Sequence, residues 1–403
     1  MGGNKILTKI KEENMKKVKK LIMIIIGLIG FFSCIKFQEH PLDPTTPQGF
    51  LFKLLREQKI KEYLIGMDKK SVFVIDLETK EVYFKQIIDI NNSNDDLVQA
   101  TQSKDNPSIL YFLKYDPDPP LTSVLKYDII HDFYESSPET FNTVSSYDKG
   151  FYYDNGYLYF ISTNDGSNCN NTCLHKIDVN TFNRTTSSNA VNFNDISNLS
   201  VGKDYVFLVN YYTKFSHYFE KNNLNNFNNI NLNSSFSYLK SVYTFTNGNN
   251  QNFVVYVGRN FSYYPSLKLD LELSTSYTNP TIINDYNYSP IPILIHRNST
   301  NELYGFIYWG SNKKSYRYNI SNNTVDIDPF ILNNYDNLFL LTQNTDESQF
   351  YVAFIDNLNG CYVAVLSPYT EIFRVQVNNN PNLCTINYLQ YFKTQQLDLS
   401  SFN

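Results

Sequence analysis

The chain carries few side chains suited to acid–base catalysis. Five histidines occur in 403 residues, and two of them, His175 and His217, each stand three residues before an acidic residue that ends an apolar segment, Asp178 or Glu220. This shared spacing is typical of packed strand positions, so we predict structural roles for both histidines. The sequence contains no Gly-x-Ser-x-Gly elbow, phosphate-binding glycine loop or His-Glu-x-x-His helix. It therefore assigns no catalytic residue.

Two groups of residues imitate metal sites. Oxygen-bearing side chains alternate through Asp89, Asn91, Ser93 and Asp95, like the first ligands of a calcium loop. The glycine and the bidentate glutamate of such a loop are missing, so an ordinary Asn-rich loop is predicted. Cys169, Cys173 and His175 would bind zinc only with a fourth ligand, which the sequence does not supply. We expect no metal site and no cofactor.

The composition favours strands and turns. The chain has 33 Tyr and 30 Phe against one Trp, and it is rich in Asn. Aromatic residues favour strands and Asn favours turns, which suits an all-β fold. The formal net charge of -5 comes from charges spread along the chain, without the basic patch that nucleic-acid binding requires. Nucleic acid is therefore excluded as a partner.

Seven apolar segments recur along the chain, each ending in a polar residue. Successive polar residues are 42 to 52 positions apart, which matches the period of four-stranded propeller blades, about 40–50 residues. Asp, Asn and Ser at such positions accept hydrogen bonds from the backbone two residues on, so we expect them to hold the turn between a third and a fourth strand. The seven residues are Asp76, Asp128, Asp178, Glu220, Asp270, Asn319 and Ser367.

An aromatic-rich strand is predicted before each of these segments. Its continuous apolar character indicates burial on both faces, as expected between adjacent blades. The seven strands are expected at 63–66, 109–113, 157–161, 205–209, 253–257, 303–309 and 350–355. The pattern resembles propeller repeats of the Kelch, NHL and quinoprotein-like kinds over roughly residues 60–392. This resemblance implies an all-β, seven-bladed β-propeller, although no paired Kelch glycines or recurring Trp-Asp dipeptides tie it to one family.

The last predicted strand indicates how the ring closes. A strand at 385–392 begins 18 residues after Ser367, and Asn337, directly before the strand 338–342, likewise stands 18 residues after Asn319. No second or third strand comes after it, whereas residues 50–61, before the first blade, look more helical than strand-like. We therefore expect the C-terminal strand to complete the first blade as its innermost strand, which removes the exposed sheet edge of an open ring.

This arrangement brings the cysteines together in pairs. Cys169 and Cys173 share the loop between the second and third strands of the third blade. Cys361 and Cys384 are expected on the face that carries such loops and the connections between blades. Four cysteines in an oxidising compartment favour the disulfides Cys169–Cys173 and Cys361–Cys384, with two buried free thiols as the alternative for the second pair.

The N-terminal segment has the features of an export signal. Lysines at 16, 17, 19 and 20 precede the apolar run Leu21–Phe32, which is too short for a comfortable membrane span. Cleavage near Ser33, retention as an anchor and lipid attachment at Cys34 all stay open. We assign 1–35 as signal peptide or signal anchor, 36–59 as a linker or stem that could include a short helix, and 60–403 as the propeller. The propeller is expected to be secreted or on the extracellular surface, or else membrane-anchored outside the cytosol.

Ten Asn-x-Ser/Thr sequons are candidates for glycosylation on export. Chance in an Asn-rich chain accounts for about that many, so their number alone is no argument. They are Asn91, Asn170, Asn183, Asn198, Asn233, Asn260, Asn287, Asn298, Asn319 and Asn322.

Two functions from different classes fit these observations. The first is a non-catalytic module, monomeric, that binds protein or glycan through the loops between second and third strands and the connections between blades. Tyr263 and Tyr264 in one such loop, and His296 on the channel-lining strand 293–296, are candidate contacts. The alternative is a propeller hydrolase, lyase or metalloenzyme at the mouth of the central channel. An enzyme should gather carboxylates or histidines from at least three blades at the channel mouth. With either function, contact with a membrane is expected only through an N-terminal anchor.

Overall fold

The computed structural model divides the chain into two units, Met1–Ile60 and Lys61–Asn403, and the fold described below is that of the second. No helix long and apolar enough to cross a membrane occurs among the described residues. The predicted signal, anchor and linker segments lie outside those residues. The structure describes residues 60–88, 94–118, 120–142, 150–163, 172–187, 196–210, 214–232, 236–259, 265–272, 281–282, 290–307, 314–322, 324–328, 337–356, 360–367, 370–378 and 386–402.

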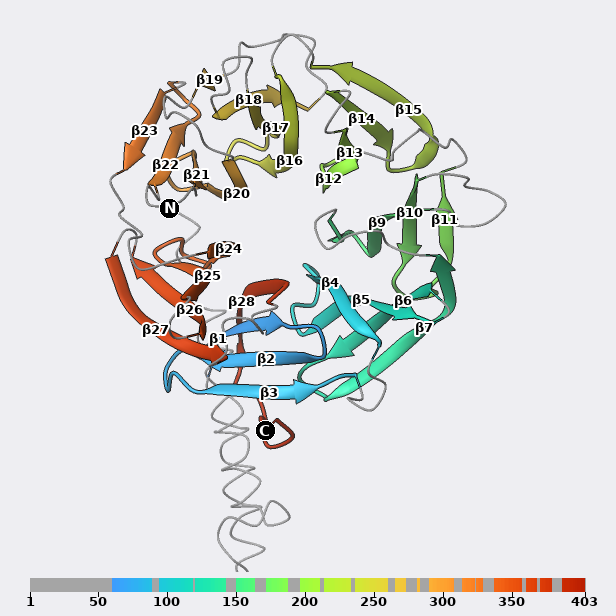
Figure 1. Ribbon diagram of the computed structural model, residues 1–403, viewed down its shortest axis with the longest axis vertical. Helices are drawn as coiled ribbons and strands as arrows, with labels where there is room; N and C mark the ends of the chain where they lie inside the picture. The colour runs from blue at the N-terminus through green and yellow to red at the C-terminus, as the bar shows by residue number, and fades with distance from the viewer. Residues whose placement is uncertain are drawn as a thin grey trace, which may run out of the picture. The chain divides into compact units, whose positions relative to one another are not determined.

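The described strands form seven four-stranded antiparallel sheets, which we call blades 1 to 7 (Figure 1). Blade 1 contains β28 (Tyr388–Gln395), β1 (Ile60–Met67), β2 (Ser71–Asp76) and β3 (Val82–Gln86). Blade 2 contains β4 (Asp96–Gln102), β5 (Ile109–Pro117), β6 (Pro120–Asp128) and β7 (Phe133–Asn142). Blade 3 contains β8 (Tyr152–Asp154), β9 (Tyr157–Thr163), β10 (Thr172–Asp178) and β11 (Arg184–Thr186). Blade 4 contains β12 (Ile196–Val201), β13 (Tyr205–Asn210), β14 (Phe215–Glu220) and β15 (Asn223–Asn231).

The remaining three blades repeat the same order from the inner strand outward. Blade 5 contains β16 (Tyr238–Thr246), β17 (Asn252–Arg259), β18 (Pro265–Leu271) and β19 (Thr281–Ile282). Blade 6 contains β20 (Pro290–Arg297), β21 (Glu302–Ile307), β22 (Lys314–Asn319) and β23 (Thr324–Asp328). Blade 7 contains β24 (Asn337–Gln343), β25 (Phe350–Asp356), β26 (Gly360–Ser367) and β27 (Thr370–Asn378). The predicted all-β propeller fold is confirmed.

The C-terminal strand closes the ring as predicted. β28 lies beside β1 at the inner edge of blade 1, and the inner strands contact one another in the order β28, β4, β8, β12, β16, β20, β24 and back to β28. The strand begins at Tyr388, three residues after the predicted start at 385, and ends at Gln395, three residues beyond the predicted end at 392. The Asn387 amide donates to the Met67 carbonyl at 2.9 Å, and the Leu397 amide donates to the Tyr63 hydroxyl at 3.1 Å. The residues on either side of β28 are thereby bound to β1.

The second strands are the cores of their blades, because each packs against a blade on either side. In β1, β5, β13 and β25, runs of consecutive residues are buried, which explains the apolar character found in the sequence. The predicted second strands match the observed ones, except that β21 is described only to Ile307 rather than to Trp309.

Four of the residues predicted to hold the turn between the third and fourth strands do so. The prediction is wrong for Glu220, which instead accepts from the side-chain amide of Asn226 at 2.6 Å. For Ser367 the residue two positions on, and for Asp270 the side chain, lies outside the described residues, so both stay predictions. The Asp76 carboxylate accepts from the amides of Glu78 at 2.9 Å and Thr79 at 3.1 Å. The same pair of bonds, to the residues two and three positions on, recurs at Asp128, Asp178 and Asn319. The repeat in the sequence is therefore a repeat of turn geometry.

Five inner strands carry an irregularity where they pair with their neighbour. The register shifts between Leu97 and Gln99 in β4 and between Ile196 and Asn198 in β12, with equivalent shifts in β16, β20 and β24. Bulges bend a strand and increase its twist, which re-aims the residues that follow. In β12, Asn198 stands directly at the shift, and its side-chain carbonyl accepts from the Val242 amide of the next blade at 3.2 Å.

Candidate binding site

Because the strands of each blade are antiparallel, the loop between its first and second strands lies on the same face of the ring as the loop between its third and fourth strands. We call this face the AB face, with A and B standing for the first and second strands. A polar cleft of 510 Å³ lies on this face across the ends of four adjacent blades, 2 to 5. This volume is within the range of about 300–1,000 Å³ that small-molecule sites occupy. The cleft is lined by Lys104, Asp154, Asn155, Val201, Gly202, Lys203, Thr244, Phe245, Thr246, Asn250, Asn252, Phe253 and Glu272.

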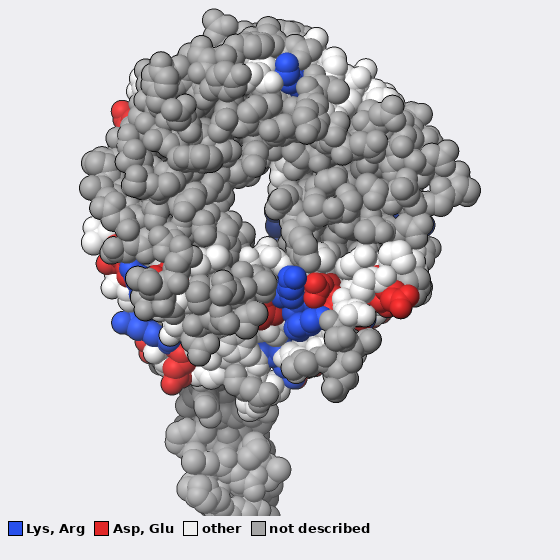
Figure 2. Space-filling model, in the orientation of Figure 1, with Lys and Arg blue, Asp and Glu red and all other residues white. Residues whose placement is uncertain are grey.

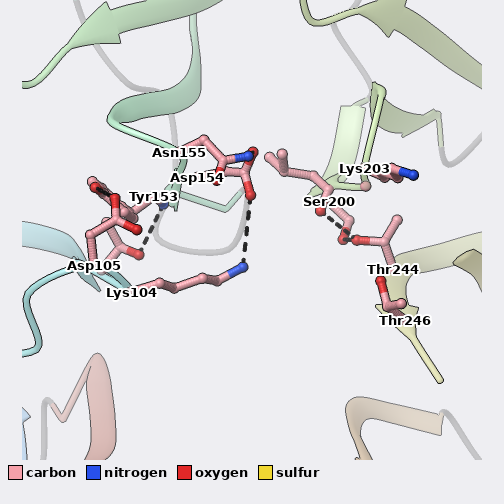
Figure 3. A network of polar contacts seen from close by, with 12 residues as sticks. Lys104, Asp105, Tyr153, Asp154, Asn155, Ser200, Lys203, Thr244 and Thr246 are labelled. Carbon is pink, nitrogen blue, oxygen red and sulfur yellow. Dashed lines mark hydrogen bonds and ion pairs between the residues drawn. The ribbon is translucent and has the colours of Figure 1, made fainter. Parts of the chain in front are cut away.

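One wall of the cleft is an arrangement of lysines around Asp154. Lys221 contacts the Asp154 carboxylate and donates to the carbonyls of Gly202 at 2.9 Å and Lys203 at 2.7 Å, which uses the three protons of its ammonium group. Lys104 extends from the loop after β4 toward the other oxygen of Asp154, at 4.0 Å (Figure 3). This distance is too long for a direct hydrogen bond, and a ligand hydroxyl could bridge the two groups.

Glu272, at the opposite side, is held by backbone amides. Its carboxylate accepts from the amides of Asp204 at 3.2 Å and Lys203 at 3.3 Å, in the loop of the neighbouring blade. Burial raises the pKa of the Glu272 carboxyl, while these hydrogen bonds oppose the rise. A Cβ on Gly202 would lie 2.5 Å from a Glu272 oxygen, so a larger residue there would displace the Glu272 carboxylate. Glu272 thus fixes the wall between blades 4 and 5.

Two phenylalanines supply the apolar surface of the cleft. Phe245 and Phe253 pair across β16 and β17 with ring centroids 5.2 Å apart and nearly parallel planes, and both rings are partly exposed. His296, which is not part of the cleft lining, stacks on Phe245 with 4.0 Å between the ring centroids. The cleft therefore offers an aromatic face that is supported from behind.

Hydroxyl and amide groups complete the lining. The Thr244 and Ser200 hydroxyls are 2.8 Å apart and link blade 5 to blade 4 (Figure 3). The Thr246 hydroxyl donates to the Asn252 side-chain carbonyl at 2.8 Å. On the face drawn in Figure 2, basic and acidic side chains lie next to each other beside the central opening, without separating into one sign of charge.

The structure places the predicted site residues in different ways. His296 is on the inner strand β20 as expected, and it supports the cleft through Phe245. Tyr263 and Tyr264 lie outside the described residues, so the predicted use of that loop stays a prediction. Cys173 and Cys361 are fully buried, whereas Cys34, Cys169 and Cys384 lie outside the described residues. The two pairings also stay predictions.

His175 and His217 are packed as predicted. His175 is fully buried and stacks on Phe160 with 5.0 Å between ring centroids, and His217 is 6% exposed. Asp95 of the calcium-like segment is bound by Lys114 at 2.7 Å. No group of three or more residues suited to metal binding occurs in the described ranges.

Among the sequons, Asn183, Asn298 and Asn322 are exposed, while Asn198 and Asn319 are partly buried and bonded to backbone amides. The other five sequons lie outside the described residues: Asn91, Asn170, Asn233, Asn260 and Asn287.

The sequence did not point to the residues of the cleft. Lys104, Asp154, Lys203 and Glu272 are far apart in the chain and belong to no motif. The signal that could have found them is positional, because most of the cleft residues lie at or just after the end of an inner strand.

No protein-family model matches the sequence, and no curated protein is similar to it. Solved structures with similar folds include a protein from Lactobacillus plantarum, with a TM-score of 0.55, 9% identity, and coverage of 83% of this chain and 100% of the other. A putative 6-phosphogluconolactonase from Bacteroides fragilis has a TM-score of 0.54 and 10% identity, covering 83% and 98%. A quinoprotein alcohol dehydrogenase-like protein from Bacteroides thetaiotaomicron has a TM-score of 0.52 and 13% identity, covering 79% and 76%. At these identities the likeness is one of propeller fold alone.

Proposed function

We propose that the protein is an exported, non-catalytic binding module that recognises a glycan in the cleft of the AB face. The supporting observation is the composition of the cleft, in which paired phenylalanine rings lie beside hydroxyl, amide and ammonium groups. Sugars present both apolar C–H faces and many hydroxyls that donate and accept, so such a mixed surface suits them. Export in the oxidised state, with the disulfides Cys169–Cys173 and Cys361–Cys384, belongs to this proposal, as does a monomeric propeller.

Both carboxylates of the cleft are engaged in holding the wall. Asp154 is bound by Lys221, and Glu272 by the backbone of the next blade. Such groups serve to position loops, and they come from only two blades. This supports binding over catalysis.

The raised pKa of Glu272 favours a second candidate, a glycan hydrolase or lyase in which Glu272 is the general acid. The two candidate functions differ in whether the bound glycan is cleaved or released unchanged. An enzyme would convert it and would lose turnover, with binding retained, in Glu272→Gln.

The test is a glycan array probed with the secreted protein, followed by calorimetry with the glycans retained. We expect binding that falls at least tenfold in Phe253→Leu, which removes one ring of the aromatic pair. Phe84→Leu, a partly exposed phenylalanine on the outer strand β3, is the matched control and should bind like the wild type. An array without hits, or equal loss in both variants, would contradict the proposal. Product in mass spectra after incubation would establish the enzyme instead.

A further inference from the structure

A second cavity, of 620 Å³, runs along the central channel beside the inner strands of blades 1 to 4. On β4 and the loop after it, the cavity extends from Gln99 to Lys104, a length of roughly 17 Å at about 3.4 Å per residue. Lys104 lines both this channel cavity and the cleft. The two spaces are therefore adjoining parts of one surface.

The short inner strand of blade 3 explains why they adjoin. β8 has three residues, whereas the inner strands on either side, β4 and β12, have seven and six. Tyr152 and Tyr153 of β8 line the channel cavity, while Asp154 and Asn155 line the cleft. The wall between the two spaces is thus only one short strand.

Neutral hydrogen-bonding groups dominate the channel cavity, with Lys104 at its junction with the cleft. Tyr152, Tyr388, Asn198, Asn387 and Gln390 all contribute to its lining. Neither the Tyr152 nor the Tyr388 hydroxyl bonds to another side chain or backbone group in the described part of the chain. Burial raises the pKa of Tyr152 to about 12 and raises that of Tyr388 as well, so both hydroxyls stay protonated donors. Asn198 uses its carbonyl for the next blade and keeps its amide protons for a ligand.

We propose, building on the glycan-binding function above, that the ligand is a linear, uncharged oligosaccharide that occupies the cleft and continues past Lys104 into the channel. Each space alone is large enough for a small ligand, and the two together exceed what one small molecule fills. The channel groups match the hydroxyls of a chain, and the bridging position between Lys104 and Asp154 suits a hydroxyl at the junction.

The experiment measures affinity by calorimetry for cello-, malto- and chito-oligosaccharides of one to six residues. We expect at least a tenfold rise in affinity from the disaccharide to the hexasaccharide of the series that binds. The double variant Tyr152→Phe/Tyr388→Phe should lower hexasaccharide affinity at least fivefold and leave disaccharide affinity within twofold. Tyr134→Phe, on the outer strand β7 and 57% exposed, is the matched control.

The outcomes separate this inference from the proposed function. Binding that does not depend on chain length, or equal losses for the short and long ligands in the double variant, would overturn the extension into the channel and leave the cleft as the site. Failure of every series to bind, with the fold intact by circular dichroism, would overturn both proposals.

Discussion

The imidazole ring of His296 stacks on the phenyl ring of Phe245, with 4.0 Å between the centroids and 27° between the planes. The two rings belong to the inner strands of adjacent blades, β20 and β16. Burial lowers the pKa of His296, so the ring is neutral at pH 7 and acts as a flat support. The position of an aromatic surface in the cleft thus depends on a histidine that does not line the cleft.

Replacing this support should weaken ligand binding. His296→Ala leaves a gap behind Phe245, and the loss of an aromatic pair worth about 1 kcal/mol corresponds to roughly a fivefold weaker affinity. His296→Phe keeps a flat ring and should remain within twofold of the wild type in calorimetry at pH 7.5. If His296→Phe loses as much as His296→Ala, the imidazole itself contacts the ligand.

His175 should make the protein sensitive to acid. Its ring nitrogens bond to the hydroxyls of Ser162 at 2.5 Å and Thr186 at 3.0 Å, and burial lowers its pKa to about 3. The unfolded chain has a histidine pKa near 6.5 and therefore binds the proton first. Stability is full above about pH 6.5 and falls toward pH 3 by roughly 1.4 kcal/mol per pH unit from this residue.

Urea unfolding between pH 7.5 and 4.5 measures this slope. His175→Gln should have a lower free energy of unfolding than the wild type at pH 7.5. Between pH 6.5 and 4.5 its free energy of unfolding should fall less steeply than that of the wild type, by the slope that corresponds to about one proton. His131→Gln, at an exposed turn, is the control. Parallel pH profiles for His175→Gln and the wild type would show that His175 does not set the acid sensitivity.

The carboxylates that hold the turns should contribute differently to the free energy of unfolding, according to how deeply each is buried. Asp76 is 4% exposed and also binds Lys61 at 2.7 Å. Asp178 is held by the backbone amides of Asn180 and Thr181, and these hydrogen bonds lower the pKa of its carboxyl. We expect Asp178→Ala to lower the free energy of unfolding by about 1 kcal/mol. Asp76→Ala should lower it by about 3 kcal/mol, because the largely buried Lys61 then keeps only the exposed Glu78, at 3.3 Å, as its partner. Asp76→Asn should fall between them, as it keeps the turn. Equal losses for the two alanine variants in urea unfolding would rule out a role for Lys61.

Of two described sequons, we expect one to carry a glycan and the other to carry none. Asn183 is exposed in a turn, whereas Asn198 lies on the inner strand with its carbonyl bonded to the Val242 amide. Mass spectrometry of the protein secreted from a eukaryotic host should find glycan on Asn183 and none on Asn198. Occupancy at Asn198 would mean that β12 is accessible before the ring closes.

Removing the closing strand β28 should destabilise the whole propeller, and not only shorten the chain. Deletion of 384–403 exposes the edge of β1 and uncovers the core that Phe392, Leu397 and Phe402 help to form. We expect aggregation or failed secretion, measured by size-exclusion chromatography and medium titre. Lys393→Ala, which removes an exposed pair with Glu62, should behave as the wild type. A secreted, monomeric truncation as heat-resistant as the full chain would contradict the closure.

The sequence was informative where structure repeats with a local chemical cause. Asp76, Asp128, Asp178 and Asn319 could be recognised because each bonds to amides two and three residues away, a purely local geometry. The second strand of each blade could also be recognised, because burial on both faces requires a continuous run of apolar residues in the sequence.

The cleft could not be predicted in this way. Lys104 and Asp154 meet because β4 and β8 happen to be neighbours in the ring, and their separation in sequence carries no period or motif. The three-residue length of β8 is equally invisible, since an apolar run at 151–153 could continue or stop. Sites made of single residues from several blades depend on tertiary placement alone.

The pairing of β28 with β1 has a consequence for biosynthesis. Of the seven sheets, blade 1 is the first to be synthesised and the last to be completed, because its inner strand is made more than 300 residues after its second strand. Co-translational folding can finish blades 2 to 7 in order, but blade 1 must wait with an open edge. A chaperone that masks extended hydrophobic strands would have its longest-lived target at β1, and a chain terminated early would stay marked for degradation by that same edge.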